Sequence, residues 1–138
     1  MKHLLLFVLL FPLFVSAQKK LDNTIIVDTV RTIKEVKQIL FNNGYSVEGN
    51  DTSFFVTSAK QMKTASVLRL MFAKGDSTII IKGQYKLQVE LSLFGVPTTN
   101  DFEMVENRLD KHNINYEYFA EMNKIAKQLG SKITYLKQ

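Results

Sequence analysis

Apolar and polar residues alternate in the second half of the chain. Along residues 79–93 every odd position is apolar or glycine, and the even positions from 82 to 92 are polar. This period of two is typical of a strand with one buried face. A straight strand over residues 79–94 would extend ~53 Å, whereas a domain of this size is ~35 Å across. We therefore expect a bend at Gly83, because glycine tolerates a kink or bulge, and we favour this over a second tight hairpin at the same point.

The preceding segment has the same alternation and predicts the partner strand. A hairpin with Gly75 and Asp76 as its two turn residues, the glycine taking a positive φ, brings apolar side chains together on one face and polar ones on the other. The opposed pairs would be Phe72 with Ile79, Leu70 with Ile81, and Arg69 with Lys82. Residues 65–94 thus predict a half-buried antiparallel sheet.

The first third of the chain predicts a strand, a helix and a hairpin. Residues 24–28 are rich in β-branched side chains, as strands are. Thr32 and Glu35 have the spacing of a helix-capping box, and Gly44 falls where a helix commonly ends in a left-handed residue. The apolar stripe of this helix consists of Ile33, Val36 and Leu40. Residues 45–48 and 53–58 are expected to pair around a turn at 49–51, in which Asp51 bonds its own backbone.

The last third returns to helical periodicity. Its apolar face comprises Tyr118, Phe119, Met122, Ile125, Ala126 and Leu129, and Gly130 marks the end of the helix. Residues 133–136 predict a short terminal strand. Residues 101–109 fit either a helix or a strand, and we favour the helix because Phe102, Val105 and Leu109 recur at helical spacing.

The N-terminus has the pattern of a secretory signal peptide. A cationic start precedes an apolar run that ends in Val15-Ser16-Ala17. Within 138 residues we therefore expect a signal peptide at 1–17, a flexible tail at 18–23 and a single α+β domain at 24–138. Gln18 follows the expected cleavage point where a lipoprotein has cysteine. We expect an exported protein, periplasmic or secreted, with no membrane span and no lipid anchor.

Candidate catalytic chemistry is sparse. The chain has no cysteine, which excludes thiolate nucleophiles and thiolate metal sites. His112 is the single histidine after residue 17 and lies in a polar stretch typical of an exposed loop. The acidic pairs Glu103 with Glu106 and Glu117 with Glu121 are interleaved with basic residues, as on solvated helix faces. We expect no catalytic residue, metal or cofactor.

The chain has a formal net charge of +5, and part of its basic charge is predicted to gather in one cluster. In the predicted hairpin Arg69, Lys82 and Lys86 gather on the polar face, with Lys60, Lys63 and Lys74 near its ends. Such a face could receive an anionic envelope component or an acidic protein. The alternative is that these lysines only keep an exposed sheet from pairing with other sheets. An exported chain is not expected to meet nucleic acid.

The order strand, helix, antiparallel meander, helix resembles small exported envelope proteins with a helix-grip domain. Examples are the domains of the C-component lipoprotein of the outer-membrane barrel assembly machinery. The resemblance covers residues 24–94, including Gly44-Tyr45-Ser46-Val47 and residues 54–58, and it departs from that lipoprotein in lacking the lipidated cysteine. It implies a non-catalytic binding or accessory role. From the pattern of elements we expect an α+β domain in which a bent antiparallel sheet of about five strands carries two helices on one face.

Two other functions stay open on the sequence. One is a small hydrolase that uses carboxylates alone, which would need two acidic side chains facing each other across a cleft. The other is an inhibitor of an exported enzyme, which would present residues 59–64 as a rigid loop. The glycines expected to matter for the backbone are Gly44, Gly75, Gly83 and Gly130.

Overall fold

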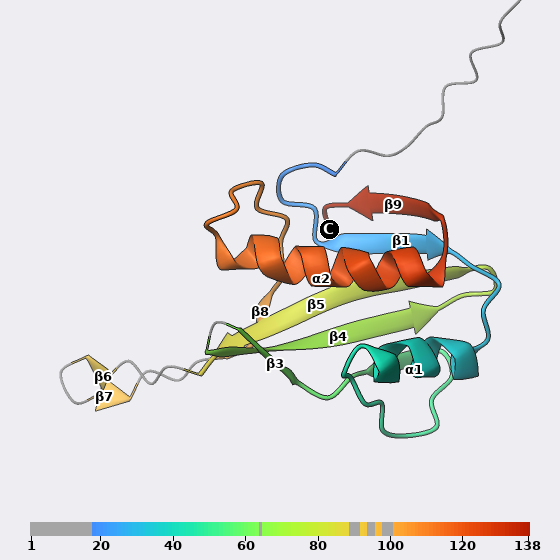
Figure 1. The fold of residues 1–138 in the computed structure, drawn as a ribbon, viewed down its shortest axis with the longest axis horizontal. Helices are drawn as coiled ribbons and strands as arrows, with labels where there is room; N and C mark the ends of the chain where they lie inside the picture. The colour runs from blue at the N-terminus through green and yellow to red at the C-terminus, as the bar shows by residue number, and fades with distance from the viewer. Residues whose placement is uncertain (1–17, 64, 89–91, 94–95, 98–100) are drawn as a thin grey trace, which may run out of the picture.

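An antiparallel sheet carries two helices on one face (Figure 1). The structure is a computed structural model, and it describes residues 18–63, 65–88, 92–93, 96–97 and 101–138. Within these residues the sheet has seven strands and is open, so the α+β class expected from the sequence is confirmed. The expected signal peptide at 1–17 lies outside the described residues.

The central strands are the longest elements of the sheet. Its order is β2-β4-β5-β1-β9, with β3 also on β4 and β8 also on β5, and every pairing is antiparallel. The strands are β1 (Thr24–Asp28), β2 (Phe54–Val56), β3 (Lys60–Met62), β4 (Ser66–Lys74), β5 (Thr78–Leu87), β8 (Glu103–Met104) and β9 (Lys132–Leu136). A separate small pair is formed by β6 (Ser92–Leu93) and β7 (Val96–Pro97). The helices are α1 (Ile33–Asn42) and α2 (Ile114–Leu129).

The start and end of α1 follow the sequence signals. The Thr32 hydroxyl accepts from the Glu35 amide, and the Glu35 carboxylate accepts from the Thr32 amide at 2.7 Å, which completes the capping box. The Thr32 amide and hydroxyl both donate to the Glu35 carboxylate and hold the pKa of Glu35 below its ordinary value. At the other end Gly44 has φ +84°, the left-handed conformation that glycine adopts without strain.

The covered face is the face of the sheet on which α1 and α2 pack. The side chains of α2 expected to be apolar and inward are all buried there. From the sheet they meet a contiguous core made of Ile25, Val27, Phe55, Leu68, Leu70, Phe72, Ile79, Ile81 and Tyr85. Val36 and Leu40 of α1 close the same core. One hydrophobic core therefore holds both helices and the sheet.

The central hairpin differs in register from the expected one. Gly75 lies opposite Thr78, and its amide donates to the Thr78 carbonyl at 2.9 Å, so the turn residues are Asp76 and Ser77. Consequently Phe72 opposes Ile81 and Arg69 opposes Gln84. Gly75 does not take the positive φ that we expected. A shift of two residues keeps every side chain on its face, so alternation alone could not distinguish the two registers.

Gly83 is required by packing and not by a bend. The β4–β5 register runs through Gly83 without a bulge, and the ten residues of β5 extend only ~33 Å, which fits the domain. A Cβ at this position would lie 2.7 Å from Met122 Sδ and 3.1 Å from Val105 Cγ2. The bend that we expected is therefore not the reason for this glycine. Its missing side chain lets α2 and residues 103–105 approach the strand.

Gly130 follows α2 for a similar reason. Its φ of −170° is extended backbone, so the helix does not end in a left-handed glycine. A Cβ here would instead clash with the carbonyl oxygen of Asp28. Glycine lets the chain turn closely past the end of β1 into β9, which pairs with β1 as the expected terminal strand.

Residues 101–109 form a strand and an extended segment where we favoured a helix. Met104 of β8 opposes Gln84, and the Val105 amide donates to the Gly83 carbonyl at 2.9 Å. Val105 is fully buried, while Leu109 is 58% exposed. The helical stripe was thus only an accident of spacing, and pairing with β5 decides the conformation.

The expected tail and first hairpin are also corrected. Asp22 is buried, and its carbonyl accepts from the Asn107 amide at 2.6 Å. The Leu21 amide donates to the Asn107 carbonyl at 2.8 Å. Residues 18–23 are therefore tied to the domain. Only Val47 and Thr57 form a bridge in the expected hairpin, because β2 pairs with β4 instead. Asp51 does accept from the amides of Ser53 and Phe54, as expected for a turn.

Candidate functional site

The sheet face opposite the helices bears both basic and apolar side chains. We call it the open face, because the described part of the chain places no helix on it (Figure 1). Its members occupy the alternate positions that point away from the core. They are Ile26, Phe54, Val56, Val67, Arg69, Met71, Ala73, Ile80, Lys82, Gln84 and Lys86.

The three basic residues singled out from the sequence all lie on the open face. Arg69 donates from Nε to the Gln84 side chain at 2.9 Å, and its guanidinium lies 3.8 Å from the centre of the Phe102 ring. Lys82, which we expected opposite Arg69, lies opposite Met71, and Lys86 lies opposite Val67. Both lysines are half-buried, and neither has an ion-pair partner among the described residues. Their stems cover the sheet while the ammonium groups reach solvent.

The other lysines of the expected cluster do not join it. Lys60 lies opposite Leu68 and reaches toward α2 on the covered face. Lys74 opposes the buried Ile79 and donates to the Gly75 carbonyl at 2.9 Å. Lys63 is exposed beyond the end of β3. The basic cluster is therefore smaller than the sequence indicated.

An apolar part of the open face was missed. Phe54 is 50% exposed and Val56 37% exposed, and they oppose Ala73 and Met71. The next strands extend this row with Ile80 and Ile26. The signal was present in the consecutive apolar residues 54–56, since a strand with only one apolar face would alternate.

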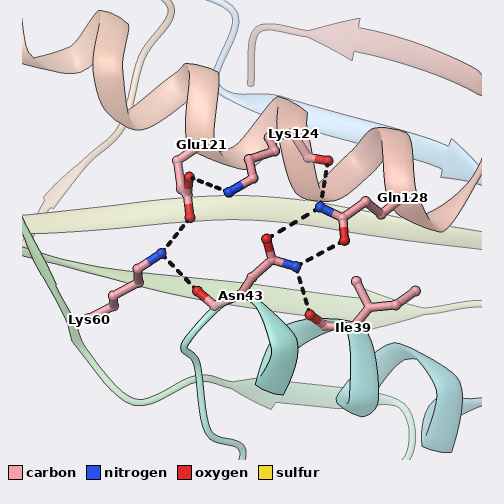
Figure 2. Close-up of polar contacts among 6 residues, drawn as sticks. All are labelled: Ile39, Asn43, Lys60, Glu121, Lys124 and Gln128. Atoms are coloured by element: carbon pink, nitrogen blue, oxygen red, sulfur yellow. Dashed lines mark hydrogen bonds and ion pairs between the residues drawn. The ribbon is translucent and has the colours of Figure 1, made fainter.

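On the covered side, a polar junction joins α1, α2 and β3 (Figure 2). Lys60 Nζ forms an ion pair with Glu121 Oε1 at 2.8 Å and donates to the Asn43 carbonyl at the same distance. Lys124 Nζ lies 3.8 Å from the other Glu121 oxygen. Glu121 is thus shared by two lysines, and its side chain is only 12% exposed.

The Asn43 side chain ties the two helices together in the same junction (Figure 2). Its Nδ2 donates to the Ile39 carbonyl at 2.8 Å and to Gln128 Oε1 at 3.0 Å. Gln128 Nε2 in turn donates to Asn43 Oδ1 at 3.3 Å. These bonds satisfy the polar groups at the end of α1, which indicates a structural role for the junction.

Tyr45 lies beneath this junction and has an unusual hydroxyl. The residue is 1% exposed, and its hydroxyl makes no hydrogen bond of ordinary geometry. Lys60 Nζ is 5.0 Å from the centre of its ring. Burial, reinforced by the nearby Glu121 carboxylate, raises the pKa of Tyr45. The hydroxyl therefore stays neutral well into the alkaline range.

The acidic residues do not assemble a catalytic pair in the described part of the chain. Glu121 is engaged by lysines, Glu103 accepts from the Tyr85 hydroxyl at 2.7 Å, and Glu106 pairs with Arg108 at 2.8 Å. His112 is exposed in a turn, as expected. Among the same residues no three His, Cys, Asp or Glu side chains gather as metal ligands would.

Comparison of the chain with protein-family models, curated proteins and solved structures finds no match. The resemblance to helix-grip envelope proteins thus stays a prediction. No helix among the described residues is both long and apolar enough to cross a membrane.

Proposed function

We propose that this protein is an exported, non-catalytic binding or accessory protein of the bacterial envelope, and that its open face binds an acidic partner protein. The observation that carries the proposal is a sheet face without a covering helix in the described chain. On it Lys82 and Lys86 have no ion-pair partner, and Arg69 is held in place by Gln84 and Phe102. Export is supported by the pattern of residues 1–17 alone.

The chemistry of the open face favours a protein over a purely ionic ligand. Phe54 and Val56 offer exposed apolar area beside the cations, so a partner gains from burying that area as well as from charge. Acidic Asp28 stands at the far end of the face and is already paired with Lys132 at 3.1 Å. The free charge of the face is therefore positive, and it would steer an acidic surface toward it.

The other two functions have less support. A hydrolase would need facing carboxylates, and Glu121, Glu106 and Glu103 are engaged by lysine, arginine and tyrosine instead. An inhibitor would need a protruding loop at 59–64, where the chain forms β3 on the edge of β4.

The first experiment is capture of partners from an envelope extract on the immobilised protein. We expect an acidic protein to bind at low salt and to elute near physiological ionic strength, because screening then acts over ~8 Å. The variant Arg69→Gln/Lys82→Gln/Lys86→Gln should lose this partner. A matched variant, Lys20→Gln/Lys111→Gln/Lys127→Gln, removes as much charge from exposed positions outside the sheet and should keep it.

Two outcomes would count against this proposal. Retention of the partner by the open-face variant, with an unchanged salt profile, would place the binding surface elsewhere. Equal loss in both variants would mean that only net charge matters.

Export can be tested separately by the mass of the protein recovered from its native host. We expect the chain to begin at Gln18, intact or cyclised to pyroglutamate. Recovery of functional protein that retains Met1 would contradict export through a cleaved signal peptide.

A further inference from the structure

A groove lies between α1 and the segment that follows it, away from the open face. Its volume is about 480 Å³, within the range of small-molecule sites. The apolar part of its lining includes Ile33, Phe41 and Val47, and the polar part includes Lys34, Lys37 and Gln38. Phe41 is 70% exposed although it is a large aromatic residue. None of these side chains belongs to the polar junction or the open face.

The two lysines of the groove lie toward the start of α1, and the exposed Phe41 lies toward its end. Lys34 and Lys37 stand on the first two turns of α1, and Phe41 stands on the last turn. The α1 part of the lining, from Ile33 to Phe41, extends ~12 Å along the helix axis. A ligand that fits this arrangement carries a negative head and an extended apolar tail.

The charges around the groove are unbalanced. No acidic side chain lines it, and Lys34 has no hydrogen-bond or ion-pair partner in the described part of the chain. Lys37 Nζ donates to the Gly49 carbonyl at 3.2 Å. The pKa of exposed Asp51 is lowered first by the backbone amides of Ser53 and Phe54 and also by the charge of Lys37. By contrast, a neighbouring hollow at the start of α1 is lined by Asp28 and Glu35 as well as Arg31. The lining of the α1 groove therefore carries a net positive charge, which favours an anionic ligand.

We propose that this groove binds a single acyl chain that ends in a carboxylate. The carboxylate lies between Lys34 and Lys37, and the chain runs past Val47 to the ring of Phe41. This site is independent of the function proposed for the open face.

The test is a titration of the full protein with sodium dodecanoate below its micelle concentration, followed by amide chemical shifts in NMR. We expect saturable shifts confined to α1 and residues 45–48. Lys34→Glu/Lys37→Glu should weaken binding roughly tenfold or more, since both charges at the head are reversed. Phe41→Ser should weaken it without an effect on folding, because the ring is already in solvent.

Controls separate this site from general amphiphile binding. Lys127→Glu reverses an exposed lysine on α2 and should bind dodecanoate like the unaltered protein. Dodecyltrimethylammonium has the same tail and a positive head, and it should not produce the groove shifts. The proposal is overturned if no saturable shifts occur, if the two amphiphiles act alike, or if the shifts map to the open face.

Discussion

The two faces of the sheet are built from alternate residues of the same strands, yet they obey different rules. The covered face holds the hydrophobic core, in which Leu68, Leu70 and Ile81 have no exposed area. The open face mixes half-buried apolar residues with lysines. The comparison shows that side-chain parity alone places the core. On the uncovered face, the pairing of the strands decides which side chains become neighbours, and therefore where apolar and basic residues gather.

Truncation of two adjacent isoleucines of β5 gives the most direct test of the difference between the two faces. Ile81→Ala on the covered face should lower the free energy of unfolding by ~2–5 kcal/mol, because it leaves a cavity in a packed core. Ile80→Ala on the open face should cost about 1 kcal/mol. Urea unfolding of both variants measures the difference. Equal losses would mean that another element covers the open face.

Gly83 tests how closely α2 approaches the covered face. Gly83→Val should lower the free energy of unfolding by ~1–3 kcal/mol through overpacking against Met122 and Val105. Met122→Ala should relieve part of that loss, and a double-mutant cycle measures the coupling. A bend in the strand would produce no coupling between positions 83 and 122, which is the result that would contradict the packing account.

The next prediction concerns the Tyr45 hydroxyl, which is buried on the covered face. Tyr45→Phe should be neutral or stabilise by up to ~1 kcal/mol, because the buried hydroxyl that it removes makes no hydrogen bond of ordinary geometry. The raised pKa of Tyr45 in the folded state also makes stability depend on pH. Below pH ~10 the tyrosine is neutral in both the folded and the unfolded state, so its ionisation costs the folded state nothing. Above that pH it ionises first in the unfolded state, so the free energy of unfolding falls.

Unfolding free energies measured from pH 8 to 11 check this prediction. We expect the alkaline loss to be smaller in Tyr45→Phe than in the unaltered protein. An equal alkaline slope in both proteins would contradict it, since Tyr85, whose pKa is also raised, would then carry the effect.

The smallest effect is expected on the open face itself. Each glutamine in the Arg69→Gln/Lys82→Gln/Lys86→Gln variant should change stability by no more than ~0.5 kcal/mol, because solvent-face substitutions rarely matter to folding. Arg69 is the member most able to exceed this, through its contact with Phe102. Thermal unfolding checks the prediction, and a large loss would identify these residues as structural.

Much of the fold was predictable where the signal is local. The Thr32–Glu35 capping box, the left-handed Gly44 and the apolar face of α2 are each encoded within a few residues, and the structure confirms them. Residues 101–109 were not predictable in this way, because Val105 becomes buried only through pairing with β5. The candidate site was predictable in part: its three cations share a face, but their neighbours differ from those expected.

Residues near one another in the sequence were enough to predict the two helices, the strands of the central hairpin and the face on which each residue of those strands lies, because helix caps and period-two alternation act through neighbouring residues. Tertiary structure alone decided the hairpin register and the pairing of β2 with β4. It also decided why Gly83 and Gly130 must lack a side chain. The physical reason is that a two-residue shift leaves every face unchanged, so only contacts between distant segments can choose the register, and only close packing excludes a Cβ.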